Sequence, residues 1–442
     1  MIFLHFVVAA GSGEIQFLKV TMIILLSLNY LKSSRVKSVI FSKHQICHMT
    51  VLITRLCRKQ ETFYGSCMDD KQIEALGPKP MLDFIREIGS WSICQDGSWN
   101  KTSWDIYKVL QQLQSTYYPA PPFFSVEVTN DHLNSTKHLI KVDQSGLSLQ
   151  REIYFKHPEM VEIYEEYMSK VATLLGTKCN TTAKMREIMD FEKQLAKFTT
   201  TAEDKAEGIY RRMKLHSLIQ LVPQFPWLDH MHAIFKEANV TETDVVLATS
   251  PSYLRKMATL LNNTSKELLS NYVVWQMIRD KVSLLSSSFR KARANFNERI
   301  SGVKDTDPRW RTCTGITNDN MGVPIGSLYI KSFFEQSAIT KTQSMVDEIK
   351  KTFKKRVKEH EWIDDKTTKY VFAKADALGS KIGYAKYVVR PKDLTSRFSS
   401  LMVNSNTFFK NNVEVDKWLD TDSSPNSGRR WTRRSGLCFH RQ

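Results

Sequence analysis

The stretch that decides the fold runs from Met321 to Tyr387 and reads MGVPIGSLYIKSFFEQSAITKTQSMVDEIKKTFKKRVKEHEWIDDKTTKYVFAKADALGSKIGYAKY. Within it, Met345, Ile349, Phe353 and Val357 recur every four residues, with Lys and Glu between them. This spacing predicts one apolar stripe along an amphipathic helix. Long patterns of the same kind recur through most of the chain, so we expect a mainly α protein with a few short strands.

A second helix is predicted after this rhythm breaks at Trp362, with Gly383 as its left-handed stop. Between the two helices lies His360-Glu361-Trp-Ile-Asp364, which begins like the zinc-protease signature H-E-x-x-H. That signature needs two histidines four apart, so that both imidazoles reach one metal from one helical face. Because position 364 is Asp, we expect a helix N-cap there instead. No catalytic or metal-binding residue is predicted.

The composition is that of a globular protein, with 42% hydrophobic and 25% charged residues among 442. The net charge of +17 resembles that of a nucleic-acid binder. However, residues 1–59 carry eight Lys/Arg against one Glu, and residues 415–442 carry six Lys/Arg against three Asp. The excess is concentrated at the two ends, so a nucleic-acid partner is not predicted. A basic binder remains the weaker alternative.

The seven cysteines are scattered and form no C-x-x-C pair, which disfavours a zinc ribbon or a redox motif. His44, Cys47, His48 and Cys57 have loose metal-like spacing but lack a second pair. Six N-x-S/T sequons favour a chain that passes through the secretory route, where disulfides form. These glycosylation candidates are Asn100, Asn134, Asn180, Asn239, Asn262 and Asn263.

Several further elements are predicted along the chain. Residues 1–59 are interpreted as a non-homologous or signal/anchor-like segment. Periodicity vanishes after Val413, so 414–442 is predicted to be a non-homologous, disordered tail. Between them, residues 60–413 form one predicted domain. Its expected strands are Phe123–Val128, His138–Val142 and Val245–Ala248, and its expected helices include Pro158–Leu175, Met185–Phe198, Ser252–Leu261 and Lys266–Phe296.

Short motifs in a fixed order carry a resemblance to a known family. They include Tyr64-Gly-Ser-Cys67-Met68, Ile88-Gly-Ser-Trp91, Asp131-His-Leu-Asn134, Pro308-Arg-Trp310, Trp362-Ile-Asp364 and Ile382-Gly-Tyr384. From residue 61 to about 413 the chain resembles the N-terminal, non-catalytic portion of the neprilysin and endothelin-converting-enzyme family of zinc metallopeptidases. The resemblance implies the helical lobe of a two-lobed ectodomain, peptide substrates, and a place outside the plasma membrane, anchored or secreted. It also implies a disulfide between Cys67 and Cys313.

The departures from the family pattern concern its chemistry. No H-E-x-x-H followed by E-x-x-x-D occurs, and N-A-Y/F-Y is absent. We therefore predict no cofactor in this chain, although complete family members hold zinc. The resemblance implies a metalloendopeptidase whose catalytic lobe is missing here, inactive as written and with apolar surface left exposed. The alternative is a non-catalytic secreted or surface protein that binds peptides as a decoy.

Overall fold

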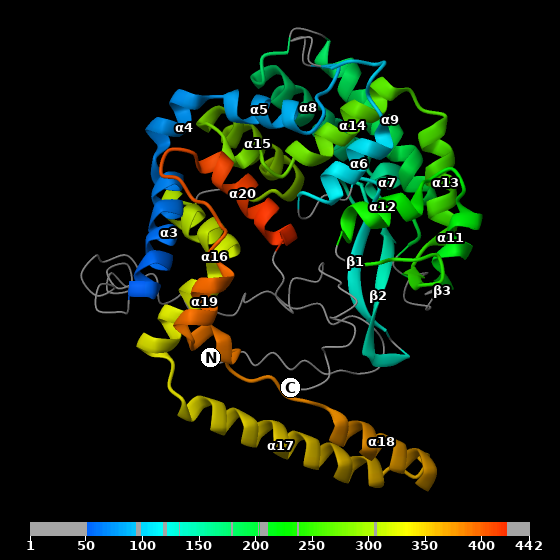
Figure 1. Cartoon of the computed structure of the whole chain (residues 1–442), viewed down its shortest axis with the longest axis vertical. Helices are drawn as coiled ribbons and strands as arrows, with labels where there is room; N and C mark the ends of the chain where they lie inside the picture. Colours follow the sequence, from blue (N-terminus) through cyan, green and yellow to red (C-terminus); the bar gives the residue numbers. More distant parts are fainter. Residues whose placement is uncertain are drawn as a thin grey trace. The chain divides into compact units, whose positions relative to one another are not determined.

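The computed structural model describes residues 51–93, 99–117, 122–131, 133–177, 180–201, 203, 211–236, 238–304 and 307–421. The chain divides into two compact units. Unit 1 contains residues up to Tyr64 together with Thr314–Ser400, and unit 2 contains Gly65–Cys313 and the chain from Leu401 on. Two of the three boundaries fall inside helices, α3 (Val51–Met68) and α16 (Arg309–Phe333), and the third lies between Ser400 and Leu401, outside any helix (Figure 1). The predicted mainly α fold is confirmed.

Unit 2 is built from short and medium helices around one small sheet. Its helices are α4 (Asp70–Leu76), α5 (Lys79–Glu87), α6 (Ile106–Gln114), α7 (Ile153–Lys156), α8 (Pro158–Leu174), α9 (Thr181–Phe198), α11 (Leu215–Leu221), α12 (Trp227–Ile234), α13 (Pro251–Asn262), α14 (Lys266–Ile278), η2 (Val282–Leu284), α15 (Ser287–Ser301) and α20 (Phe408–Thr421). Local signals set several of these ends. Pro158 opens α8, and Gly176 follows its end at φ +86°, as predicted.

The sheet of unit 2 has four strands in the order β1-β2-β4-β3. Strands β1 (Phe124–Asp131) and β2 (Asn134–Gln144) form an antiparallel hairpin, which Figure 1 shows as two long arrows. Strand β4 (Val245–Ala248) pairs parallel with β2, and β3 (Arg211–Lys214) pairs antiparallel with β4. The three strands expected from the sequence are therefore confirmed. The fourth strand, β3, was not predicted.

The core of unit 2 centres on α14, where Leu269 to Ile278 are all buried. The Tyr272 ring lies 4.9 Å from the rings of Phe123 and Phe191, centroid to centroid. Its hydroxyl donates to the carbonyl oxygens of Pro122 and Gly146. Gly146 has φ +96°, and a Cβ added there would lie 1.9 Å from the Pro122 carbonyl oxygen. Only glycine lets the chain pass this close to Tyr272.

Two predicted boundaries in unit 2 are wrong. The expected continuous helix Lys266–Phe296 is broken: α14 ends at Ile278, and the short η2 precedes α15. Leu285 is extended (φ −93°, ψ −168°), and Ser286, the residue before α15, is also non-helical with ψ 167°, so the helix is interrupted there. The periodicity does not end at Val413 either, because α20 runs to Thr421. Val415 and Trp418 beyond that point are 0% and 6% exposed.

Unit 1 contains the helices of the stretch from Met321 to Tyr387 and of the residues directly after it. They are α17 (Ser337–Lys358), α18 (Asp365–Ala377), η3 (Lys386–Val389) and α19 (Pro391–Arg397), besides the parts of α3 and α16 that belong to this unit. Helix α16 is kinked. Met321 has non-helical dihedral angles, and Pro324 lies inside the helix. Lys59 of α3 donates to the Phe398 carbonyl at 2.8 Å. Helix α18 ends at Ala377, so the predicted stop at Gly383 is wrong.

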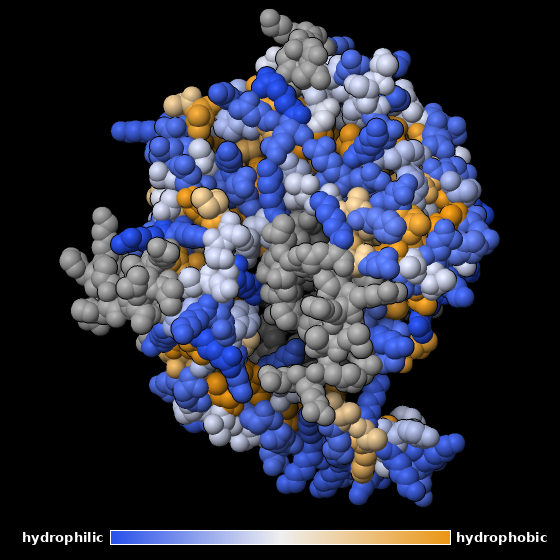
Figure 2. All heavy atoms as spheres, viewed as in Figure 1, coloured by the Kyte–Doolittle hydropathy of each residue, from blue (hydrophilic) through white to orange (hydrophobic). Residues whose placement is uncertain are grey.

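Three of the four residues of the predicted apolar stripe of α17 are exposed, although the helix itself is confirmed. Met345, Ile349 and Phe353 are 55%, 55% and 48% exposed. The buried residues are Thr342, Val346 and Val357. Figure 2 shows that the visible face of the α17–α18 pair is mostly hydrophilic. Exposed apolar side chains are thus present in unit 1. No helix in the part of the chain that the structure describes is both long and apolar enough to cross a membrane.

Candidate functional site

The zinc-like segment lies at a solvent-exposed junction between two helices. His360 and Glu361 follow the end of α17, and Trp362 is 81% exposed. The Asp364 carboxylate accepts a hydrogen bond from the Thr367 backbone N–H at 2.6 Å, and hydrogen bonding from the Thr367 side chain, together with that backbone bond, lowers the Asp364 pKa. Asp364 is therefore the predicted N-cap. With one imidazole and no histidine four residues on, the donors do not fit a zinc site of the H-E-x-x-H type.

Two further histidines lie on α12, and each forms a hydrogen bond within unit 2. His230 on α12 is fully buried, and its Nε2 lies 2.9 Å from the Gln114 Oε1. Burial lowers the His230 pKa to about 3, so the ring stays neutral. His232 on the same helix is exposed and hydrogen-bonds the Val240 carbonyl. Across the described ranges, no group of three or more His, Cys, Asp or Glu side chains lies close enough to hold a metal ion.

Of the four N-terminal residues with loose metal-like spacing, Cys57 alone lies within the described residues. His44, Cys47 and His48 lie outside the described residues. Cys57 is a buried free thiol in α3, 4% exposed. Burial is the main cause that raises its pKa to about 11, so the reactive thiolate is not populated near neutral pH.

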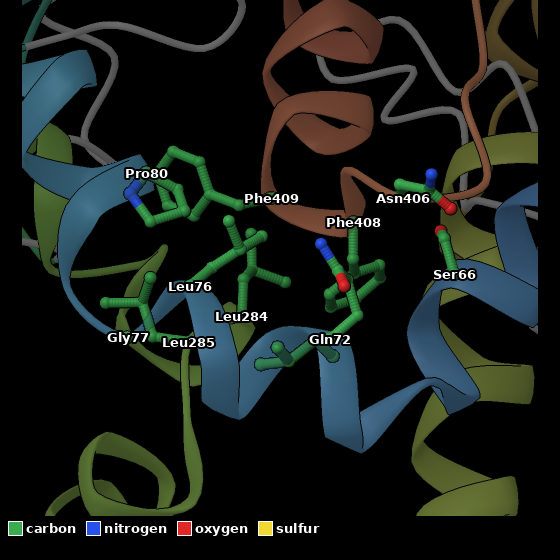
Figure 3. A pocket seen from close by; sticks show the side chains of 11 residues that line it. Ser66, Gln72, Leu76, Gly77, Pro80, Leu284, Leu285, Asn406, Phe408 and Phe409 are labelled. Atoms are coloured by element: carbon green, nitrogen blue, oxygen red, sulfur yellow. The ribbon is translucent and has the colours of Figure 1, made fainter.

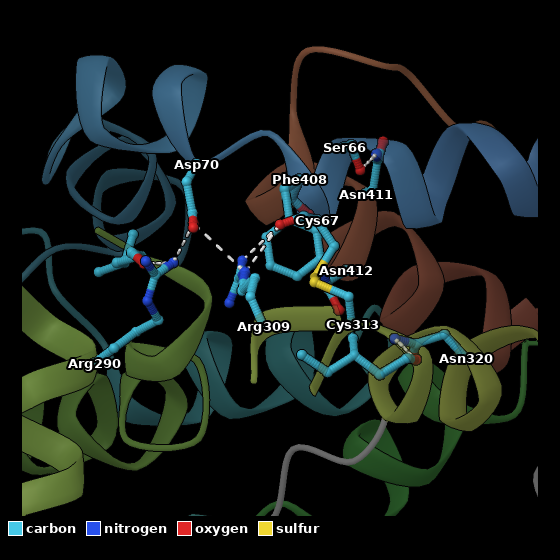
Figure 4. Close-up of a disulfide and its surroundings, with 12 residues drawn as sticks. Ser66, Cys67, Asp70, Arg290, Arg309, Cys313, Asn320, Phe408, Asn411 and Asn412 are labelled. Atoms are coloured by element: carbon cyan, nitrogen blue, oxygen red, sulfur yellow. Dashed lines mark hydrogen bonds and ion pairs between the residues drawn. A yellow bond between two sulfur atoms is a disulfide. The ribbon is translucent and has the colours of Figure 1, made fainter. Parts of the chain in front are cut away.

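The structure contains the disulfide that the resemblance implies, between Cys67 on α3 and Cys313 on α16 (Figure 4). Both cysteines are fully buried in unit 2. The Arg309 guanidinium donates to the Cys67 carbonyl at 2.7 Å and lies 3.5 Å from the Asp70 carboxylate. Arg290 of α15 reaches the same carboxylate at 3.0 Å. These contacts fix the backbone on the α3 side of the disulfide.

A buried carboxylate joins three segments of unit 2. Glu192 of α9 is 0% exposed and accepts hydrogen bonds from the Ser148 backbone and hydroxyl, from the Tyr154 hydroxyl and from the Gln276 amide. Burial outweighs these bonds and raises the Glu192 pKa. The sequence pattern of α9 did not reveal this network, because its donors lie 38 to 84 residues away along the chain. It is a structural element of the core.

The cavity beside the disulfide region is too small for a ligand. It lies between α4, α5 and α20, and Figure 3 shows Phe408 and Phe409 of α20 opposite Leu76 and Leu284. Its volume is about 10 Å³. That is at the lower limit for one water molecule. The apolar lining therefore marks where α20 packs in unit 2.

A larger groove runs between α9 and α13, with a volume of about 750 Å³. This is within the range of about 300–1,000 Å³ typical of ligand sites. Its α9 side carries Glu187 and Asp190, its α13 side carries Arg255 and Lys256, and its lining also includes apolar side chains. The lining residues are Glu187, Asp190, Phe191, Gln194, Phe198, Arg255, Lys256, Thr259, Leu260, Asn263, Thr264, Ser265 and Leu268. Sequence patterns identified Asn263 as a sequon but not the groove beside it.

The six sequon asparagines all lie on the surface. Each of Asn100, Asn134, Asn180, Asn239, Asn262 and Asn263 is exposed. Asn180 is the N-cap of α9 and accepts from the Ala183 N–H. The Asn262 amide oxygen lies 3.0 Å from the Tyr107 hydroxyl that donates to it. Exposure makes all six compatible with a bulky, solvated modification.

Comparisons with known proteins agree on one family. Residues 28–385 match the model of peptidase family M13. Endothelin-converting enzyme 1 from Bos taurus is 33% identical over 378 residues, which are 84% of this chain and 50% of that protein. Neprilysin-3 from Drosophila melanogaster is 31% identical over 374 residues, 81% of this chain and 47% of the relative.

Solved structures share the fold. The open state of the zinc metalloprotease Zmp1 from Mycobacterium tuberculosis aligns with a TM-score of 0.67 at 18% identity, covering 90% of this chain and 59% of that one. PepO from Lactobacillus rhamnosis aligns at 0.66 and 15% identity, covering 89% and 61%. The chain spans about half the length of the curated relatives it matches.

Proposed function

The chain belongs to peptidase family M13, since the family model matches residues 28–385, and on that premise we propose that it supplies the helical, non-catalytic portion of a neprilysin-like metalloendopeptidase. The observation that carries the proposal is this match together with an M13-like fold over 90% of the chain. Peptide hydrolysis in such enzymes uses water activated by zinc. The printed sequence has no H-E-x-x-H. His360 and Glu361 lie at an exposed junction between two helices, without the second histidine of that signature.

We propose accordingly that the chain by itself does not cleave peptides. The test is a purified, disulfide-bonded chain, assayed for bound zinc and for cleavage of a quenched fluorescent peptide with and without a chelator. We expect less than stoichiometric zinc and no chelator-sensitive turnover. Bovine endothelin-converting enzyme 1 is the positive control. Stoichiometric zinc with turnover that Glu361→Gln abolishes would show that the junction is catalytic after all.

A second candidate function is a secreted or surface decoy that binds peptides without cutting them. The open groove between α9 and α13 is the observation that favours it. The same peptides, followed by fluorescence anisotropy, separate the two functions. Saturable binding without cleavage supports the decoy, and neither binding nor cleavage supports a purely structural portion.

We further propose that the chain is placed outside the plasma membrane or is secreted. The buried disulfide fits an oxidising compartment, and the six exposed sequons fit passage through the secretory route. Expression with a secretory leader in animal cells tests this placement. An intact disulfide and at least one occupied sequon are expected. A folded cytosolic product that remains reduced and equally stable would contradict it.

A further inference from the structure

We propose that the groove between α9 and α13 binds short peptides of about three residues in which both the N-terminal amine and the C-terminal carboxylate are free. The inference rests on the second candidate function, peptide binding without cleavage. It deepens that function by naming the length of the ligand and the two chemical ends that the groove recognises.

The two helices that form the groove run antiparallel to each other. At one end, the Thr200 hydroxyl, just after α9, donates to the hydroxyl of Ser250, the N-cap of α13, at 3.0 Å. At the other end, the Lys184 Nζ of α9 lies 2.9 Å from the Glu267 Oε1 of α14, the helix that follows α13. The C-terminal end of α9 therefore lies beside the N-terminal end of α13.

This arrangement places opposite charges at the two ends of the groove. Arg255 and Lys256 lie near the start of α13, and the Lys256 ammonium is 5.7 Å from the centre of the Phe198 ring at the end of α9. Glu187 and Asp190 lie further back on α9, toward the end where α13 stops. The acidic end attracts the N-terminal ammonium group of a peptide, and the basic end attracts its C-terminal carboxylate.

Asp190 and Arg255 are the charges available for this role. Both side chains are exposed, and neither has an ion-pair partner among the residues that the structure describes. Glu187, in contrast, already lies 3.4 Å from the Lys184 ammonium, and Lys256 lies over the Phe198 ring. Asp190 and Arg255 are therefore assigned to the two ends of the ligand.

The distance between the two ends sets the length of the ligand. Asp190 and Phe198 are eight residues apart on α9, which corresponds to about 12 Å along the helix axis. An extended peptide spans about 3.3–3.6 Å per residue, so about three residues cover this distance. A much longer peptide places only one of its ends in the groove and loses the other charge contact.

The middle of the groove suits an apolar residue and a peptide bond. Phe191 lines the groove but is only 2% exposed, because its ring packs in the core against Phe123 and Tyr272. Leu260 on α13 is half-buried and adds apolar surface. The exposed Gln194 amide offers both a donor and an acceptor for the backbone of a ligand. A few polar groups around apolar surface are the usual construction of a ligand site.

The test is isothermal titration calorimetry of the full, disulfide-bonded chain after endoglycosidase treatment. The probes are the tripeptide Ala-Leu-Ala with free ends, its N-acetylated form, its C-terminal amide, and a ten-residue peptide with both ends capped. For the free tripeptide we expect a dissociation constant of about 0.1 mM. Each cap on the tripeptide is expected to weaken binding about fivefold, as the loss of one exposed ion pair does.

Two substitutions assign each end of the ligand to one residue. Arg255→Gln is expected to weaken the free and the N-acetylated tripeptides about fivefold and to leave the amide unchanged, since the amide has no carboxylate to lose. Asp190→Asn is expected to weaken the free tripeptide and the amide and to leave the N-acetylated form unchanged. A merely structural role for either residue would weaken all three forms alike.

A third substitution tests the groove itself. Thr259 is exposed and lines the groove from the middle of α13, so Thr259→Trp fills it and is expected to abolish binding of the tripeptide. The matched control is Ser252→Trp, which places the same bulk on an exposed position of α13 outside the lining. It is expected to leave binding unchanged. Thermal unfolding of both variants checks that the fold is kept.

The remaining outcomes contradict the inference in distinguishable ways. Binding of the free tripeptide that is no tighter than that of its capped forms, or that survives Thr259→Trp, would overturn it. Peptide binding without cleavage still stands if the capped ten-residue peptide binds saturably in that case. If no peptide binds at all, the inference and the decoy function both fall, and the proposal of a non-catalytic portion still depends on its own zinc and cleavage assays.

Discussion

Removing the disulfide between Cys67 and Cys313 is predicted to be among the most damaging changes to unit 2. The two cysteines are separated by 246 residues. In the chain-entropy model, a cross-link over so long a loop lowers the entropy of the unfolded chain by an amount worth about 5 kcal/mol near 25 °C. The double substitution Cys67→Ser, Cys313→Ser also leaves two hydroxyls at fully buried positions. The free energy of unfolding should therefore fall by about 5 kcal/mol, a large part of a typical domain's stability.

The measurement is urea denaturation followed by tryptophan fluorescence, because three of the fully buried side chains are Trp91, Trp227 and Trp275. Cys57→Ala is the matched control, since it removes another buried sulfur but no cross-link. We expect that control to cost about 1 kcal/mol. The reasoning about loop entropy would be refuted if the double variant lost no more stability than Cys57→Ala does.

Three further predictions concern positions described above. Gly146→Ala should cost about 3 kcal/mol or more in thermal unfolding, because φ is +96° and the new Cβ would overlap the Pro122 carbonyl; Gly315→Ala, in an open part of α16, should instead be neutral or stabilise by up to about 1 kcal/mol. Burial raises the pKa of Glu192 in the folded protein above its unfolded-state pKa of 4.5. Glu192 therefore stabilises the fold fully below pH 4.5, and this stabilisation is lost as the pH rises through the folded-state pKa. Glu192→Gln should remove this loss, and parallel stability–pH curves for the two proteins would contradict that assignment. Trp418→Ala should destabilise by about 3–5 kcal/mol in urea, while Met402→Ala, at a 71% exposed position, should change stability by no more than about 0.5 kcal/mol; equal effects would show that α20 is not packed.

The sequence predicts elements well where the signal is local. Pro158 and Gly176 mark the two ends of α8, and the run Val245–Ala248 is strand β4 residue for residue. Proline fixes the dihedral angle that a first helical turn needs, and glycine accepts the left-handed turn that ends a helix. Such effects depend on neighbouring residues alone, so they are visible in the sequence.

Features that depend on distant contacts were not predictable. The apolar pattern continues through Leu284 and Leu285 although the helix is broken there. Both side chains are buried, and a buried position favours an apolar residue whether or not its backbone is helical. On α17, the spacing of Ile349 and Phe353 shows where an apolar face lies but not whether anything covers it. The groove beside Asn263 requires α9 and α13 to meet. Periodicity reports one element at a time.

The division of unit 2 into two separate pieces of sequence has a consequence for how the protein is made. The Glu87 carboxylate on α5 forms an ion pair with the Lys417 ammonium group on α20, 330 residues later in the chain. During synthesis, α5 and the sheet emerge long before α20, and the whole of Thr314–Ser400 must be translated in between. Contacts at such separation form slowly. Until Phe408 to Thr421 leaves the ribosome, α20 cannot cover the apolar surface beside Leu76 and Leu284, and a chaperone that binds nascent apolar segments can bind there.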